Sequence, residues 1–188
     1  MRRPGRRKNP PIVMPMPPQE LAETWNRCSS RLLLIARAIG EPAEDAVQEA
    51  FLQLARQSPT PDDPFAWLVT VTRNQLLQWR RSGDRRRRRE QTPQGSVWFD
   101  DAHRQIETQL DAERVTDALV TLESQTRQVI VMHLWGEMSF DKIAEVIGCS
   151  RSTAHRTFQS GIRTMRQRFE PSPDARPGVS VQGVISDE

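Results

Sequence analysis

The stretch "SFDKIAEVIGCSRSTAHRTFQSGIRTMRQRF", residues Ser139–Phe169, decides the fold of this chain. Its apolar residues recur at steps of three and four in two separate runs, as they do along one face of an α-helix. Gly148 ends the first run, and glycine often terminates helices because it accepts a left-handed backbone at little cost. Ser150 then stands where its hydroxyl oxygen can cap a second helix. We therefore predict two helices joined by a tight turn.

The second predicted helix is strongly basic, with five arginines and no acid between Ser150 and Phe169. A helix-turn-helix places its second helix in the major groove of DNA, where the N-terminal half reaches base edges. Arginine can pair bidentately with guanine, and glutamine with adenine. An ordinary helical hairpin with a solvated basic face remains the alternative for this stretch taken alone. The candidate DNA-reading residues lie off the apolar stripe: Arg151, Ser152, His155, Arg156, Gln159 and Arg163.

The composition of the chain suits a soluble nucleic-acid-binding protein. Of its 188 residues, 36% are hydrophobic and 27% are charged, and the mean hydropathy is −0.66. The net charge is only +3, but the arginines are clustered, which favours a polyanionic partner. No apolar run has the length of a membrane span, and prolines interrupt the apolar residues after the basic N-terminus. We expect a cytoplasmic protein without a secretory signal or membrane insertion.

No pattern in the sequence signals catalysis or metal binding. The two cysteines, Cys28 and Cys149, are far apart in the chain, and the three histidines are scattered. Neither a Ser-His-Asp set, a metal-ligand cluster nor a phosphate-binding loop is present in the sequence. We therefore expect a protein that is not an enzyme, with no catalytic residue, no metal site and no cofactor.

Helical periodicity also organises the N-terminal half of the chain. The β-branched run Val69–Thr72 has low helix propensity and leaves a strand as an alternative at that point. Helical spacing continues through Leu76 and Trp79, however, so a helix is favoured. The predicted helices of this half cover residues 19–40, 41–57 and 65–81.

Segments of biased composition flank the helical patterns. Five consecutive arginines, Arg85–Arg89, repel one another and have glycine and proline nearby, which indicates a linker. The fold is therefore expected to be all-α, with two small helical domains joined by a flexible linker and the helix-turn-helix in the second domain. The expected parts are a disordered basic arm over 1–18, a first domain over 19–82, a linker over 83–110, a second domain over 111–170 and a disordered acidic tail over 171–188.

Three motifs in this order resemble a bacterial RNA polymerase sigma factor of the sigma-70 family, of the extracytoplasmic-function type. They are "AEDAVQEAFLQLAR" at 43–56, "PFAWLVTVTRNQLLQWRR" at 64–81 and the terminal helix-turn-helix. Each motif alone is weak, whereas their order and spacing are specific. The resemblance implies a factor that binds core RNA polymerase, directs it to a two-part promoter and assists DNA melting.

The resemblance also implies roles for single residues. Asp45, Gln48 and Glu49 match the family's surface for docking on core polymerase, where charges provide steering. The loop over residues 58–64 falls where the family captures a flipped base, and the second domain corresponds to the reader of the upstream promoter element. The residues assigned to the downstream promoter element are Arg73, Asn74, Gln78, Trp79 and Arg80.

The sequence departs from the family pattern at the second helix of the helix-turn-helix. Arg156 stands one position away from the usual arginine, which on a helix is a rotation of about 100°. The resemblance further implies an anti-sigma factor that clamps the two domains, although no residue identifies it. Two alternatives stay open: a stand-alone helix-turn-helix regulator, and a DNA-processing enzyme such as a recombinase, whose catalytic residues the sequence lacks.

Overall fold

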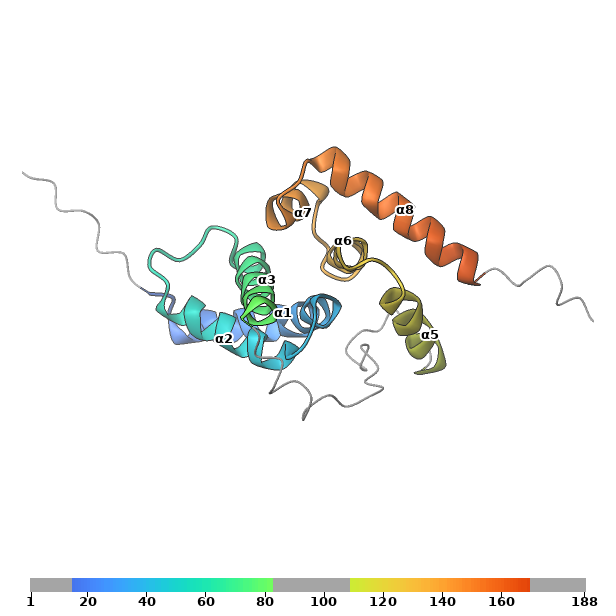
Figure 1. The fold of residues 1–188 in the computed structure, drawn as a ribbon. Helices are drawn as coiled ribbons and strands as arrows, with labels where there is room; N and C mark the ends of the chain where they lie inside the picture. Colours follow the sequence, from blue (N-terminus) through green and yellow to red (C-terminus); the bar gives the residue numbers. More distant parts are fainter. Residues whose placement is uncertain (1–14, 83–108, 170–188) are drawn as a thin grey trace, which may run out of the picture.

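The computed structural model describes residues 15–82 and 109–169, and every regular element in these two ranges is an α-helix (Figure 1). The expected all-α fold is therefore confirmed for this part of the chain. The acidic tail and most of the basic arm and the linker lie outside the described residues. The first domain contains α1 (Pro18–Ile39), α2 (Ala43–Arg56) and α3 (Pro64–Arg81), and the second contains α5 (Gln109–Val120), α6 (Ser124–Leu134), α7 (Phe140–Ile147) and α8 (Arg151–Phe169).

The three helices of the first domain pack against one another in all three pairs. Each helix presents an apolar stripe to this core, with Leu32, Leu54 and Leu76 fully buried. The β-branched turn of α3 is helical despite its low propensity, because Val69 is fully buried in the core. Thr70 also donates its hydroxyl proton to the carbonyl oxygen of Ala66, 2.9 Å away. Tertiary burial thus overrides local propensity here.

The helix-turn-helix forms as its sequence predicts. Ser139 caps α7 by accepting a hydrogen bond from the backbone N–H of Lys142 at 3.3 Å. Gly148 ends α7 in the left-handed region, with φ +80°, and its N–H donates to the carbonyl of Ala144. Ser150 Oγ accepts from the backbone N–H of Thr153 at 3.1 Å and so caps α8.

Two boundaries differ from the sequence-based expectation. Met16, which the sequence places in the basic arm, is only 5% exposed and belongs to the hydrophobic core. The prolines that suggested disorder there instead start α1, since proline is well suited to the first turn of a helix. At the other boundary, α5 begins at Gln109, so its first two residues fall in the segment expected to be linker.

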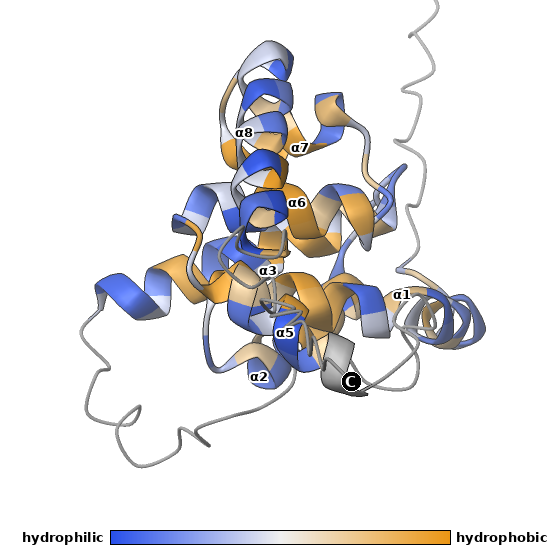
Figure 2. Ribbon diagram, turned by 90° about the vertical axis from the view of Figure 1, so that its right-hand side faces the viewer, coloured by the Kyte–Doolittle hydropathy of each residue, from blue (hydrophilic) through white to orange (hydrophobic). Residues whose placement is uncertain are grey.

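Helix α6 is the element that joins the two domains. It contacts α7 and α8 in its own domain and α1 in the first domain, and α3 contacts α7 (Figure 1). At this junction a Cβ added to Gly136 would lie 2.9 Å from Cδ1 of Ile35, so the backbone after α6 approaches α1 closely. Figure 2 shows the apolar residues of α6 in the interior, while α8 presents a mostly hydrophilic surface.

A second close approach, between α8 and α6, generates a stability prediction. A Cβ added to the buried Gly161 would lie 2.5 Å from Cγ2 of Thr126 and 2.6 Å from Cδ1 of Ile130. Gly161→Val is therefore expected to lower the free energy of unfolding by about 2 kcal/mol, measured by urea denaturation. The matched control is Ser160→Val at the exposed neighbouring position, which changes only helix propensity, by a few tenths of a kcal/mol. Equal losses in the two variants would contradict the packing.

Candidate functional site

The acidic ridge on α2 consists of Asp45, Gln48 and Glu49. Asp45 and Gln48 are exposed and Glu49 is half-buried, because Ala46, Val47 and Ala50 turn the other side of the helix into the core. Gln53 donates to Glu49 Oε1 at 3.4 Å and helps to hold this carboxylate in place. The ridge is thus a polar surface with negative charge that the fold leaves accessible.

The structure adds two neighbours of the ridge that the sequence analysis does not name. Leu52 is 50% exposed, one turn beyond Gln48, and it extends the ridge with apolar surface. Glu44 is instead bound within its own domain, since Arg37 donates to its Oε1 at 2.9 Å. Partial burial tends to raise the pKa of Glu44, but the Arg37 guanidinium and a backbone hydrogen bond together outweigh that effect and hold the pKa below its usual value. Leu52 could have been found from its i+4 spacing to Gln48.

The candidate DNA-reading residues all lie on α8 and are all exposed. Each residue of an α-helix is rotated by about 100° from the one before it. All six candidate residues therefore lie within an arc of about 140° around α8, with Arg151 at one edge and Arg156 at the other. The arc includes the start of the helix, where Arg151 Nε lies 3.4 Å from Asp141 Oδ2 of α7. The structure therefore brings these six residues together on one surface, as the helical spacing predicts.

A cluster of aromatic rings from α6, α7 and α8 packs against His155, one of the candidate residues on this surface. The ring of His133 stacks on Phe140 at a centroid distance of 4.2 Å, and Phe158 meets His133 edge-on at 4.7 Å. Phe140 in turn meets His155 of α8 at 5.0 Å with an interplanar angle of 83°. Two of the histidines that are scattered in the sequence therefore meet around one phenylalanine. No sequence signal marks this cluster, because its members come from three different helices.

His155 also contacts another candidate residue. Its Nε2 lies 3.4 Å from the side-chain nitrogen of Gln159, one turn further along α8. An amide nitrogen can only donate, so His155 Nε2 accepts this hydrogen bond. The Gln159 amide keeps one N–H and its oxygen available, which is the pair that binds adenine bidentately. The cluster thus fixes His155, and His155 orients Gln159.

The candidate residues of α3 divide into two groups. Asn74, Gln78 and Arg80 are exposed, whereas Arg73 and Trp79 are half-buried. Arg73 Nε donates to the side-chain oxygen of Gln128 in α6, 3.1 Å away, and so contacts the second domain. Burial lowers the pKa of the Arg73 guanidinium, and the nearby charge of Arg81 acts in the same direction.

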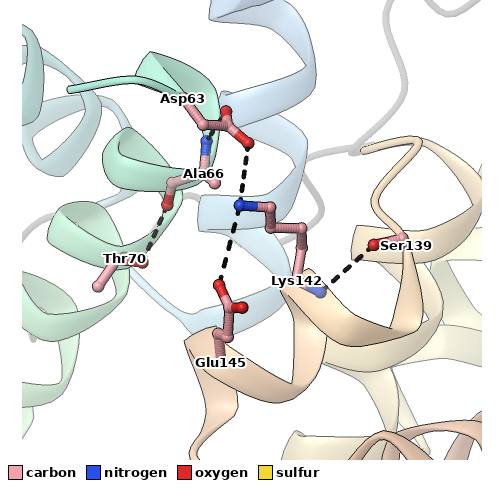
Figure 3. A network of polar contacts seen from close by, with 6 residues as sticks. All are labelled: Asp63, Ala66, Thr70, Ser139, Lys142 and Glu145. Carbon is pink, nitrogen blue, oxygen red and sulfur yellow. Dashed lines mark hydrogen bonds and ion pairs between the residues drawn. The ribbon is translucent and has the colours of Figure 1, made fainter.

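The loop before α3 also contacts the second domain. Asp63 Oδ1 caps α3 by accepting from the backbone N–H of Ala66 at 3.0 Å. Its other carboxylate oxygen lies 3.6 Å from Nζ of Lys142 in α7, which is 3.9 Å from Glu145 Oε2 (Figure 3). The last acid of the 58–64 loop is therefore held from both domains.

Two arginines complete the domain junction. Arg31 of α1 is ion-paired with Glu137, which follows α6, and its guanidinium lies 4.7 Å from the centroid of the Phe65 ring. Arg127 of α6 donates from Nε to the carbonyl oxygen of Ala38 at 2.8 Å. Ala38 lies in the last turn of α1, where carbonyls lack a partner within the helix. None of these contacts was predicted from the sequence.

Within residues 15–82 and 109–169, no group of three or more His, Cys, Asp or Glu side chains has the arrangement of a metal site. None of the helices in this part of the chain combines the length and the hydropathy of a membrane span.

Two family models match the sequence, each over one of the domains. The model "Sigma-70 region 2" matches residues 28–86, and the model "Sigma-70, region 4" matches residues 112–165. The first therefore covers most of α1 to α3 and the second covers most of α5 to α8. The order of the two matches along the chain is the order of the motifs that the sequence shows.

The chain is also similar to proteins of Mycobacterium tuberculosis. It is 31% identical over 129 residues to "ECF RNA polymerase sigma factor SigL", with 66% of this chain and 72% of that protein covered. It is 32% identical over 155 residues to "Probable ECF RNA polymerase sigma factor SigI", with 72% of this chain and 52% of that protein covered.

Solved structures share the fold. One is the sigma factor RpoE in complex with the anti-sigma factor NepR from Bartonella quintana, with a TM-score of 0.59 and 22% identity, covering 80% of this chain and 94% of that chain. Another is CnrH in complex with the cytosolic domain of CnrY, with a TM-score of 0.54 and 24% identity, covering 80% of this chain and 88% of that chain.

Proposed function

Because the chain belongs to the extracytoplasmic-function RNA polymerase sigma factors of the sigma-70 family, we propose which of its surfaces carries each part of that function. A sigma factor binds core RNA polymerase, directs it to promoters and assists DNA melting. The observation that supports the assignment best is that two exposed surfaces of different chemistry occur on the two domains: the acidic ridge of α2 and the arginine-rich face of α8.

The acidic ridge is the surface that docks on core polymerase. Asp45 and Gln48 are exposed and form no ion pair within residues 15–82 and 109–169, so they remain available to a partner with positive charge. The exposed Leu52 adds apolar contact area beside them. Charges at such an interface provide steering and specificity, while apolar residues provide much of the affinity.

The face of α8 reads the upstream promoter element. Gln159 is oriented by His155, which suits it to adenine, and Arg156 lies beyond them on the same exposed arc. The exposed arginines Arg151 and Arg163 are suited to phosphate oxygens, which position a protein on the duplex.

The first domain reads and opens the downstream promoter element through α3 and the loop before it. Arg73, Asn74, Gln78 and Arg80 supply hydrogen-bond donors along α3, and Trp79 supplies a ring on which an unpaired base can stack. The 58–64 loop accepts the flipped base, with Asp63 holding the loop to the start of α3.

The remaining assignments follow from the family. Sigma factors in general are not enzymes, and this chain has only binding roles in our proposal, with no cofactor. It acts in the cytoplasm with the polymerase. Since one structure with the same fold is a sigma factor in complex with an anti-sigma factor, an anti-sigma factor is a further partner that we propose for this chain.

A transcription experiment tests this function. The chain is mixed with bacterial core RNA polymerase and a genomic promoter library, and the transcripts are sequenced. We expect new start sites that share two upstream sequence elements. Failure to bind core polymerase, together with dimeric binding to a palindromic site, would instead support the stand-alone regulator.

A variant with reversed charge on the acidic ridge tests the docking surface in the same experiment. Replacing Asp45 and Glu49 by lysine is expected to weaken binding to core polymerase about tenfold or more, since like charges then face each other. The matched control replaces Glu113 and Asp117, two exposed acids four residues apart on α5. An affinity as low in the control as in the ridge variant would remove the ridge from the interface.

A double-mutant cycle tests how α8 reads DNA. Gln159→Ala is expected to lose about 1–3 kcal/mol of base preference at one position of the upstream element. His155→Ala should weaken the preference at that same position, and the double variant should lose little more, because His155 acts through Gln159. Arg156→Ala should act at a different position. Losses for His155 and Gln159 that simply add, measured by binding to a library of promoter variants, would refute their coupling.

A further inference from the structure

A carboxylate of α7 faces the first residue of α8. Asp141 Oδ2 lies 3.4 Å from Nε of Arg151, and the two side chains are 66% and 70% exposed, so the ion pair lies on the surface. Arg151 begins α8, and the N-terminal half of the second helix of a helix-turn-helix is the part that reaches base edges. Arg151 therefore has a charged partner at a position where contacts with bases are expected.

The aromatic cluster places Asp141 beside Arg151. Phe140, the residue before Asp141, meets the ring of His155 at 5.0 Å and the ring of Phe158 at 5.5 Å. His155 lies about one turn after Arg151 along α8. The first turn of α7 is therefore held against the first turns of α8 by packed rings. The position of the Asp141 carboxylate thus depends on this packing as well as on the surface ion pair.

Hydrogen bonds at the two helix starts fix the backbones from which this pair projects. Ser139 Oγ accepts from the backbone N–H of Lys142 at 3.3 Å at the start of α7 (Figure 3). Ser150 Oγ accepts from the backbone N–H of Thr153 at 3.1 Å at the start of α8, and it lies 2.8 Å from Thr153 Oγ1. The acid and the arginine are therefore both attached to capped helix ends, and mainly their own rotamers are free.

The contact decides which edge of Arg151 is available to a ligand. A guanidinium is a rigid plane with one N–H on Nε and two on each Nη. Asp141 lies at Nε, and the high exposure of the side chain leaves the Nη groups at its outer end accessible. Guanine presents O6 and N7 in the major groove, two acceptors that match a pair of arginine N–H groups. An arginine that is already held at Nε also loses less conformational freedom on binding.

The same carboxylate disfavours a phosphate as the ligand of Arg151. A phosphate bound there would lie close to Asp141, and the two negative charges would repel each other. The ion pair also has no net charge, so it gains less from the release of counterions from DNA. A guanine edge is uncharged and escapes this penalty. Arg163 differs, since it forms no ion pair within residues 15–82 and 109–169 and keeps its full charge for phosphates.

A structural role is the alternative explanation for Asp141. It lies in the first turn of α7, where a negative charge interacts favourably with the helix dipole. That interaction does not involve Arg151, so it predicts no effect of Asp141 on the choice of base. The two explanations therefore differ in whether the effects of Asp141 and Arg151 are coupled.

We propose that Asp141 is a positioning residue, which holds Arg151 at Nε, directs its outer edge to a guanine of the upstream promoter element and keeps it off phosphates. This inference rests on the proposed role of α8 as the reader of that element. It refines the phosphate contact that the charge of Arg151 alone suggests. Asp141 acts through Arg151 and contacts no base itself.

A double-mutant cycle measures the coupling of the pair. Binding to duplexes that are randomised over the upstream element is compared for the full-length chain alone and for its complex with core polymerase. Arg151→Ala is expected to lose about tenfold of the preference for guanine at one position. Asp141→Ala should lose about threefold at that same position, as suits an exposed ion pair, and the double variant should lose no more than Arg151→Ala. Asp141→Glu, which keeps a carboxylate within reach, should retain the preference.

Binding to DNA of unrelated sequence gives a readout of opposite sign. Asp141→Ala releases Arg151 for a phosphate, so it should bind such DNA about threefold more tightly, with a plot of log affinity against log salt that is steeper by about 0.9. A damaged fold would weaken binding instead. The matched control is Glu145→Ala, which removes the same charge one turn further along α7, where the side chain is 71% exposed. This control should leave the preference for guanine unchanged, and it shows how much tighter binding results from net charge alone.

The outcomes separate this proposal from the proposed function. Losses that simply add, an equal loss of preference at every position, or the absence of any guanine preference that depends on Arg151 would each refute the positioning role. A gain in Glu145→Ala as large and as salt-dependent as in Asp141→Ala would refute the exclusion of phosphate. If the chain neither binds core polymerase nor starts transcription, the proposed function fails, while binding of the chain alone to the randomised duplexes still tests the pair.

Discussion

The packing of α6 against α1 is the constraint on which the rest of the structure depends. Gly136 lets the chain after α6 approach Ile35 closely, and Arg127 reaches the last turn of α1 from the same helix. Once α6 is placed in this way, Gln128 meets Arg73, and α7 comes to lie beside α3. We infer that this close approach of Gly136 to Ile35 sets how the described parts of the two domains pack, and that it brings the polar side chains of the junction within reach of one another.

This arrangement separates the surfaces to which we assign different functions. The acidic ridge and the proposed DNA-reading face of α8 are accessible to solvent, whereas Arg73 and Asp63, which we assign to promoter opening, contact the second domain. Exposed ion pairs typically contribute about 0–1 kcal/mol each, so the polar part of the junction is weak enough for larger partners to displace. Core polymerase offers such a partner, since protein interfaces of ordinary size involve many more contacts. The polar contacts between the domains are therefore individually weak.

The sequence predicts the local parts of this structure well and the domain junction not at all. The caps at Ser139 and Ser150 and the turn at Gly148 were predictable because each depends on neighbours within four residues. Met16 was misplaced because proline is common both in disordered segments and at helix starts. The partners at the junction are separated by 55, 89 and 106 residues in the pairs Arg73–Gln128, Ala38–Arg127 and Arg31–Glu137. Pairs that distant leave no periodic signal, because helical periodicity reports only on neighbours within a few turns.

The distance between the two domains, in the free chain and in the promoter complex, tests the central claim most directly. Spin labels can be placed at Arg56, at the end of α2, and at Gln167, near the end of α8, since both residues are exposed and lie away from the junction. Cys149 is replaced by serine so that it takes no label, and Cys28 is buried, with a pKa raised by that burial and lowered less by Arg31 and Arg27. A single short distance in the free chain that becomes longer on binding polymerase and promoter is the predicted result. A broad distribution in the free chain, or the same distance in both states, would contradict the account.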